Sequence, residues 1–360
     1  MALRLFLVLA CTFLLFASRE PLPESPGLSG LPDLGAAGQQ LLAAVCMAAA
    51  GVVFYGLVRR RGASPRAAVL LTLVCALSTS CFTYVRHSVV ISVQTLVLLL
   101  FVKESLRAAE KPAMGRILRV APLAALILWH LATRTGPAWS FSALGPGLYG
   151  LFFSTGKSVF LYSPPLVLVP LSLGSAWREK RLETAFLLAL IAVGLGSNAR
   201  LLQWQGDHDF GPREAVPFVP LAMLLLVPWL PAAMSRGHML WRRYIVALLC
   251  ALGLAVQLVG AAFHWENYYR LLEAFQTQTG TAGFFQARLG HAHYLPQFSP
   301  LRGQWWLLSH KLRGDANLQA MHAAHSFLAV WDNHDLADPL PQFPLQVSTE
   351  ERRQNGRATM

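Results

Sequence analysis

The residues of this chain best suited to chemistry gather in one polar stretch, WQGDHDFGPREAVPFVP, which runs from Trp204 to Pro220 between two long apolar segments. It holds two aspartates, a histidine, an arginine and a glutamate, in a chain of which only 13% is charged. Charged residues beside a membrane helix are costly unless they meet water or a cavity, so this cluster indicates a functional site. Its carboxylates can accept protons or bind a metal ion, and its arginine can bind phosphate.

Two interpretations stay open for these charges. Asp207-His208-Asp209 has the Asp-x-Asp spacing found where two carboxylates hold a metal ion. The same residues are also consistent with ordinary solvated charges in a loop. Arg213 directly follows a Gly-Pro pair and offers planar donors suited to phosphate, whereas an arginine next to a membrane helix also reaches toward lipid headgroups. The sequence therefore requires no cofactor and leaves room for a divalent metal.

The elements that must position these residues are membrane helices. The chain has 360 residues, of which 54% are hydrophobic. Its apolar residues come in runs approaching about 20, the length that crosses a hydrocarbon core of about 30 Å. A soluble domain of this size carries about twice this fraction of charged residues. The sequence therefore predicts an all-α, polytopic membrane protein.

We predict about nine transmembrane helices, separated by loops rich in Gly, Pro or charged residues. The expected spans are residues 3–17, 36–58, 67–84, 88–102, 117–132, 159–173, 184–199, 215–233 and 244–263. The first also fits a cleaved signal peptide, but no small-residue cleavage site precedes a clear mature start, so we favour a short membrane helix. Residues 264–347 are expected to form a tail packed on the membrane face, and residues 348–360 a disordered terminus.

Lysine and arginine are concentrated in every second loop of this scheme, in residues 59–66, 103–119, 178–181 and 236–243. Because cytoplasmic loops are enriched in Lys and Arg, these loops are expected inside the cell. The N-terminus is then cytoplasmic, and both the Trp204–Pro220 loop and the C-terminal tail face outward. A second outward loop carries Arg134 and Lys157, so these two cations and Arg213 can form a cradle for an anion.

Several other functions are disfavoured by the composition and the motifs. The net charge of +12 is split among loops and is not interleaved with exposed aromatics, which argues against a nucleic-acid partner. All five cysteines lie inside apolar runs, so they form neither a disulfide framework nor a CxxC metal site. The FSTGKS segment that ends at Ser158 lacks the earlier glycine of a phosphate-binding loop, because Leu151 stands there.

Four stretches carry a family resemblance. They are Gly206-Asp207-x-x-x-Gly211-Pro212-Arg213 with the two prolines that follow, GLYGLFFSTGKSVFLYSPPLVL over residues 147–168, ALSTSCFTYVRHS, and the segment from Tyr294 to Leu308. Together they resemble the GT-C-like superfamily of bacterial multi-pass glycosyltransferases that use polyprenyl-phosphate sugars, which includes protein mannosyltransferase-like and lipopolysaccharide sugar-transferase-like proteins. The similarity covers residues from roughly 40 to 310.

The resemblance implies a reaction on the outer face of the bacterial cytoplasmic (inner) membrane. The donor would be a lipid-linked sugar, and the acceptor a hydroxyl of a cell-envelope glycan, lipid or protein. Attack on the anomeric carbon would displace polyprenyl phosphate with inversion. Such chemistry needs cations for the leaving phosphate, and Arg213, Lys157 and Arg134 suit that role. We expect Trp204, His208 and Tyr162 to line the substrate site.

The same chemistry needs a carboxylate that accepts the proton of the acceptor hydroxyl. The superfamily places this acid in a long first outer loop, whereas the corresponding loop here is only Ser18 to Gly35. Asp33 is the candidate in that loop, and Asp207 and Asp209 are the alternatives.

Two other classes of function remain as rivals. A non-catalytic membrane component of envelope polysaccharide or lipid assembly would keep the phosphate cradle and lack the base. A transporter is less favoured, because it would show inverted repeats and charges inside broken spans, and we find no such repeat in the sequence.

Overall fold

The computed structural model describes residues 35–110, 114–115, 118–124, 141–154, 156–200, 210–230 and 240–262. In this part of the chain 87% of the residues are helical and none lies in a strand, as an all-α protein requires. The predicted span at 3–17, the tail at 264–347 and the terminus at 348–360 lie outside the described residues. Of the span predicted at 117–132, residues 118–124 are described, and they are helical.

Four of the described helices are long and apolar enough to cross a membrane. They are α2 (Gly35–Arg60), α5 (Val89–Glu110), α10 (Arg181–Ala199) and α13 (Leu240–Ala262). They correspond to the spans predicted at 36–58, 88–102, 184–199 and 244–263, but α5 continues eight residues beyond the predicted end, to Glu110. Their charged residues lie at the helix ends, where Lys and Arg can reach the polar surface of a bilayer. The chain is therefore an integral membrane protein.

The span predicted at 67–84 is interrupted. Helix α3 (Pro65–Leu77) begins after Ser64, whose side chain accepts a hydrogen bond from the amide of Ala67, and α4 (Cys81–His87) follows a short break. At the break, the backbone N–H of Ser80 donates to Oγ of Ser163 at 3.0 Å. A hydroxyl from a distant loop thus takes up an amide that a continuous helix would bond internally.

Two further predicted spans are divided by prolines, which lack the amide that a helix needs. Residues 159–173 form α8 (Val159–Tyr162), the 3₁₀ turn η2 (Pro164–Leu168) and the start of α9 (Val169–Glu179). Residues 215–233 include most of the 3₁₀ turn η3 (Arg213–Phe218) and α11 (Val219–Leu224). Neither segment is a single continuous helix.

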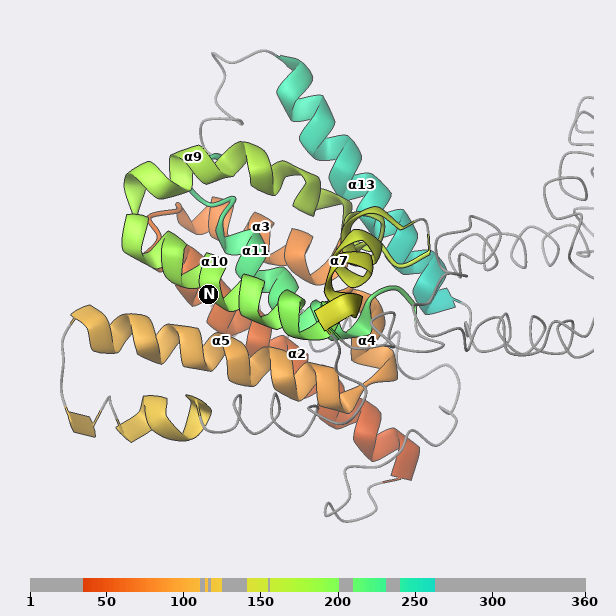
Figure 1. Cartoon of the computed structure of the whole chain (residues 1–360), viewed down its shortest axis with the longest axis horizontal. Helices are drawn as coiled ribbons and strands as arrows, with labels where there is room; N and C mark the ends of the chain where they lie inside the picture. The colour runs from red at the N-terminus through yellow and green to blue at the C-terminus, as the bar shows by residue number, and fades with distance from the viewer. Residues whose placement is uncertain are drawn as a thin grey trace, which may run out of the picture.

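The short helix α11 lies at the centre of the bundle. It contacts α2, α3, α5 and α10, and Figure 1 shows it beside α3 in the middle of the helices. The side chains of Val219, Leu221 and Leu224 are buried. The polar stretch, from its described part at Phe210 onward, therefore continues into the hydrophobic core.

One end of the bundle is held by an ion-pair cluster, made of Arg60, Arg61, Glu110, Lys180 and Glu183. Arg60 lies 2.9 Å from Glu110, and Lys180 lies 3.6 Å from Glu183. Arg61 is buried, and burial lowers the pKa of its guanidinium while Glu183 and Glu179 act to raise it. The cluster joins the ends of α2 and α5 to the start of α10.

Candidate functional site

The candidate site lies at the opposite end of α10 from the ion-pair cluster. Helix α10 has 19 residues, which at 1.5 Å per residue separates its two ends by about 28 Å. Next to its last residue, Nδ2 of Asn198 donates to the backbone carbonyl of Glu214 at 2.9 Å. Helix α7 (Leu144–Phe153) meets the same end, because a Cβ at Gly147 would overlap the backbone of Ala199.

The first part of the site is the loop between α7 and α8, which contains the STGKS sequence. The amide of Lys157 bonds to Oγ of Ser154 at 2.9 Å, and the hydroxyl of Ser158 donates to the carbonyl of Phe152 at 2.6 Å. The hydroxyl of Tyr162 donates to the carbonyl of Gly156 at 2.9 Å. These bonds hold the loop in a compact turn.

Lys157 is fully buried, and its ammonium joins this turn to the second part of the site. Its Nζ lies 3.3 Å from the carbonyl oxygen of Gly211, to which it donates a hydrogen bond. Burying an ammonium costs free energy unless the group is hydrogen-bonded. The bond to Gly211 therefore offsets part of the cost of burying Lys157. The contact links two motifs that are 54 residues apart in the sequence.

Gly211 permits the two segments to approach this closely. Its φ of 79° lies in the left-handed region that favours glycine. A Cβ at this position would lie 2.6 Å from the ring of Tyr162. The neighbouring ring of Phe210 meets Tyr162 edge-on, with 4.7 Å between the ring centroids. The Gly-Pro-Arg sequence therefore packs directly on the STGKS loop.

Helices α4 and α13 support the same contact from within the bundle. The hydroxyl of Tyr84 donates to the carbonyl of Phe210 at 3.0 Å, and a Cβ at Gly260 would lie 2.5 Å from the Phe210 ring. Gln257 bridges α4 and the first loop: its Oε1 accepts from Thr83 at 2.6 Å and its Nε2 donates to the carbonyl of Tyr162 at 2.6 Å.

Arg213 and Glu214 form the polar edge of the site. Nε of Arg213 donates to Oε1 of Glu214 at 3.1 Å. The Arg213 side chain is 39% exposed, whereas that of Glu214 is 8% exposed. The amide of Arg213 also bonds to the carbonyl of Gly211 at 3.1 Å, the oxygen that receives Lys157. The ammonium of Lys157 and the backbone of Arg213 are therefore tied to the same carbonyl.

Of the residues predicted for the site, Lys157, Tyr162 and Arg213 are brought together around Gly211. The other predicted site residues lie outside the described residues: Asp33, Arg134, Trp204, Asp207, His208 and Asp209. Among the residues that the structure describes, no group of three or more His, Cys, Asp or Glu could hold a metal ion. The metal alternative raised for Asp207 and Asp209 therefore remains a prediction.

Sequence reasoning missed the supporting residues Tyr84, Phe210 and Gln257. Gln257 could have been identified from the sequence, because it is the only amide side chain in the apolar helix α13. Buried polar residues in membrane helices tend to hydrogen-bond neighbouring segments. Tyr84 and Phe210 gave no such signal, since aromatic residues are common at helix ends for many reasons.

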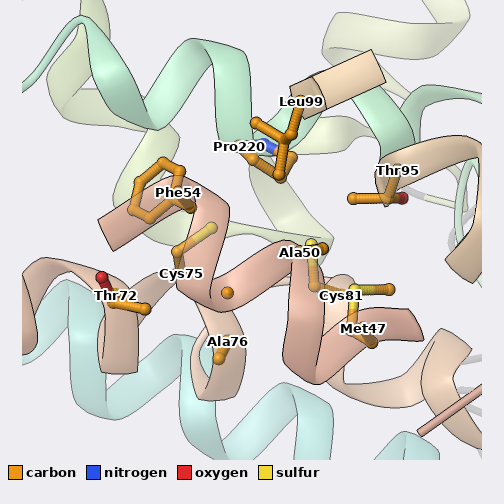
Figure 2. A pocket seen from close by; sticks show the side chains of 11 residues that line it. Met47, Ala50, Phe54, Thr72, Cys75, Ala76, Cys81, Thr95, Leu99 and Pro220 are labelled. Atoms are coloured by element: carbon orange, nitrogen blue, oxygen red, sulfur yellow. The ribbon is translucent and has the colours of Figure 1, made fainter. Parts of the chain in front are cut away.

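A cavity also lies in the core, away from this site. Figure 2 shows it among Met47, Cys75, Cys81 and Thr95, with Pro220 on its wall. The space is about 20 Å³, enough for about one water molecule. It is too small for a sugar or a phosphate, so it carries no part of the candidate site.

No family model, curated protein or solved structure matches this chain. The resemblance to sugar transferases therefore remains a prediction from the sequence motifs described above.

Proposed function

We propose that this chain is a glycosyltransferase-like protein of the bacterial inner membrane. It transfers a sugar from a polyprenyl-phosphate carrier to a cell-envelope acceptor on the outer face. The observation that carries the proposal is the hydrogen bond from buried Lys157 to Gly211, which joins the STGKS loop to the Gly-Pro-Arg sequence. These are two of the stretches that resemble the superfamily, and each supplies a cation.

In the proposed reaction, the oxygen of an acceptor hydroxyl bonds to the anomeric carbon of the sugar. The bond from that carbon to the phosphate oxygen breaks, and polyprenyl phosphate leaves. Arg213 stabilises the charge that develops on the departing phosphate, with Arg134 as a further candidate. Lys157, which is fully buried, supports Arg213 from behind by holding the Gly211 carbonyl. A carboxylate takes the hydroxyl proton, and Asp33, Asp207 and Asp209 remain the candidates for it.

A second candidate is a non-catalytic subunit of envelope assembly that binds the same lipid phosphate. One observation favours it: in the described part of this end of the bundle, the single carboxylate is Glu214, and it is already paired with Arg213. A transporter is less well supported, because the charges of the four long helices lie at their ends and not at mid-membrane.

The test uses the full chain in phosphatidylcholine nanodiscs. Binding of decaprenyl phosphate is measured first, and then release of that lipid from a panel of decaprenyl-phosphate sugars with envelope lipid as acceptor. Arg213→Ala should weaken binding about tenfold or more, since it removes a charge-assisted hydrogen bond to the phosphate. Lys157→Met should also weaken binding, because it removes the buried hydrogen bond that holds the Gly211 turn beside Arg213. Arg66→Ala is the matched control, because Arg66 is exposed at the ion-pair end and should bind normally when replaced.

Release that depends on Arg213 would support the transferase. Binding without release would support the non-catalytic subunit. Wild-type affinity in both Arg213→Ala and Lys157→Met would remove the basis of either proposal.

A further inference from the structure

The carboxylates of the described residues are unevenly distributed between the two ends of the bundle. Five glutamates lie in this part of the chain. Four belong to the ion-pair end, where they face arginine or lysine side chains: Glu104, Glu110, Glu179 and Glu183. The fifth, Glu214, lies about 28 Å away at the far end of α10, beside the phosphate cradle.

Glu214 is held in place on several sides. Its backbone carbonyl accepts the amide hydrogen bond of Asn198, and η3, to which it belongs, packs on α5 and α10. Its side chain is 8% exposed, and Oε1 lies 3.1 Å from Nε of Arg213. A carboxylate buried to this extent needs a strong hydrogen-bond partner, and Arg213 supplies one.

This contact fixes the neighbouring guanidinium. Five N–H donors lie in one plane in arginine, so a bond at Nε sets the orientation of the whole group. An anion that reaches Arg213 then meets a group whose plane is already set, and less conformational entropy is lost on binding. Outer partners that orient a binding side chain in this manner commonly contribute to affinity.

Burial argues against a direct role for this carboxylate as the base. A general base must come within hydrogen-bond distance of the acceptor hydroxyl, and the small exposed fraction of Glu214 leaves little surface for a bulky acceptor. Its carboxylate oxygen is moreover engaged by Arg213.

We propose that Glu214 is the positioning residue for Arg213, acting through the Nε–Oε1 hydrogen bond to hold the guanidinium ready for the phosphate of a lipid-linked donor. This inference rests on the proposed function. Glu214 is not among the residues that the superfamily resemblance assigned to the site.

The experiment compares Glu214→Gln with Glu214→Met in phosphatidylcholine nanodiscs, with decaprenyl phosphate as the probe. The two replacements are similar in length, but only glutamine offers an oxygen that can accept from Nε. Glu214→Met should weaken binding roughly tenfold and Glu214→Gln by no more than about threefold, the difference being one hydrogen bond to a charged group. Thermal unfolding of each variant is followed in parallel, and Glu214→Ala replaces the methionine variant should that one fail to fold.

The decisive measurement is the double mutant. In an Arg213→Ala background, Glu214→Met should have no further effect, because the two residues act as one unit. A purely structural role for Glu214 would weaken binding by the same factor in both backgrounds, and that result would overturn the proposal. Equal losses for Gln and Met, or no loss for Met, would overturn it as well.

The outcomes also separate this inference from the proposed function. If Arg213→Ala binds normally, the phosphate cradle itself is wrong. If Arg213→Ala is weak and Glu214→Met is normal, only the role of Glu214 fails. If Glu214→Gln binds normally but releases no lipid from a sugar donor that the wild type turns over, Glu214 is the base and the positioning role is wrong.

Discussion

At the scale of single residues, Gly211 determines whether the two loops of the site can meet. Its carbonyl receives both Lys157 and the amide of Arg213. Its backbone adopts a φ of 79°, and the space where a side chain would begin is filled by the Tyr162 ring. The conformation and the lack of a Cβ are both needed, so no other residue type fits this position.

We therefore expect Gly211→Ala to lower the free energy of unfolding by about 1–3 kcal/mol through backbone strain and the clash with Tyr162. Decaprenyl phosphate binding should fall with it. Gly196→Ala is the control, because that glycine lies within α10 and a Cβ there would meet nothing within 4 Å. Alanine in a helix should be neutral or stabilise by up to about 1 kcal/mol. Equal melting temperatures for the two variants would contradict this account.

The site residues differ in how far the sequence alone could place them. Arg213 was singled out because it follows a Gly-Pro pair just before an apolar run and offers planar donors suited to phosphate. The structure places it next to the Gly211 turn with its side chain 39% exposed. Lys157 was expected as one cation of the cradle, but its complete burial was not foreseen. That burial depends on the fit of Gly211 against Tyr162, which is a tertiary contact with no local pattern in the sequence.

At the scale of elements, continuous apolar helices were predictable and interrupted ones were not. Helices α2, α5, α10 and α13 follow from hydropathy and length. Residues 159–173 and 215–233 are also apolar and were predicted as continuous helices, but prolines divide them into short turns. In the first segment the carbonyl of Tyr162 accepts a hydrogen bond from Gln257 of α13, so the local geometry depends on neighbours that a sequence pattern does not reveal.

The ion-pair cluster offers a test at this scale. Glu183 is 18% exposed and faces Arg60, Arg61 and Lys180 at 3.6–4.0 Å. Glu183→Gln leaves the buried Arg61 with a weaker partner, so we expect a loss of about 1–3 kcal/mol in unfolding free energy. Glu110 lies closer to Arg60, at 2.9 Å, but is 61% exposed. Glu110→Gln should cost less than about 1 kcal/mol, as exposed ion pairs do.

Denaturant titration of both variants in detergent micelles measures this difference. A larger loss for Glu110→Gln than for Glu183→Gln would mean that distance, and not burial, governs the strength of the cluster.

At the scale of the whole molecule, charge is separated along the bundle. The ion-pair cluster gathers parts of three basic loops at one end, as the alternation of Lys and Arg along the sequence predicted. Lys157 and Arg213 lie at the other end, beyond the 19 residues of α10. If the positive-inside rule holds, the ion-pair end is cytoplasmic and the candidate site opens outward, where a lipid-linked sugar would be presented.

This orientation can be tested with two single cysteines, Arg66→Cys at the ion-pair end and Arg213→Cys at the site. Both arginines have solvent access, whereas Cys46, Cys75 and Cys81 are buried and should not react with a polar reagent. With Cys11 and Cys250 replaced by serine, a membrane-impermeant maleimide should label Cys at 213 in intact spheroplasts. It should label Cys at 66 only after the membrane is permeabilised. The reverse pattern would place the site in the cytoplasm, where the donor would have to be one that faces inward, and the proposed outer-face transfer would fail.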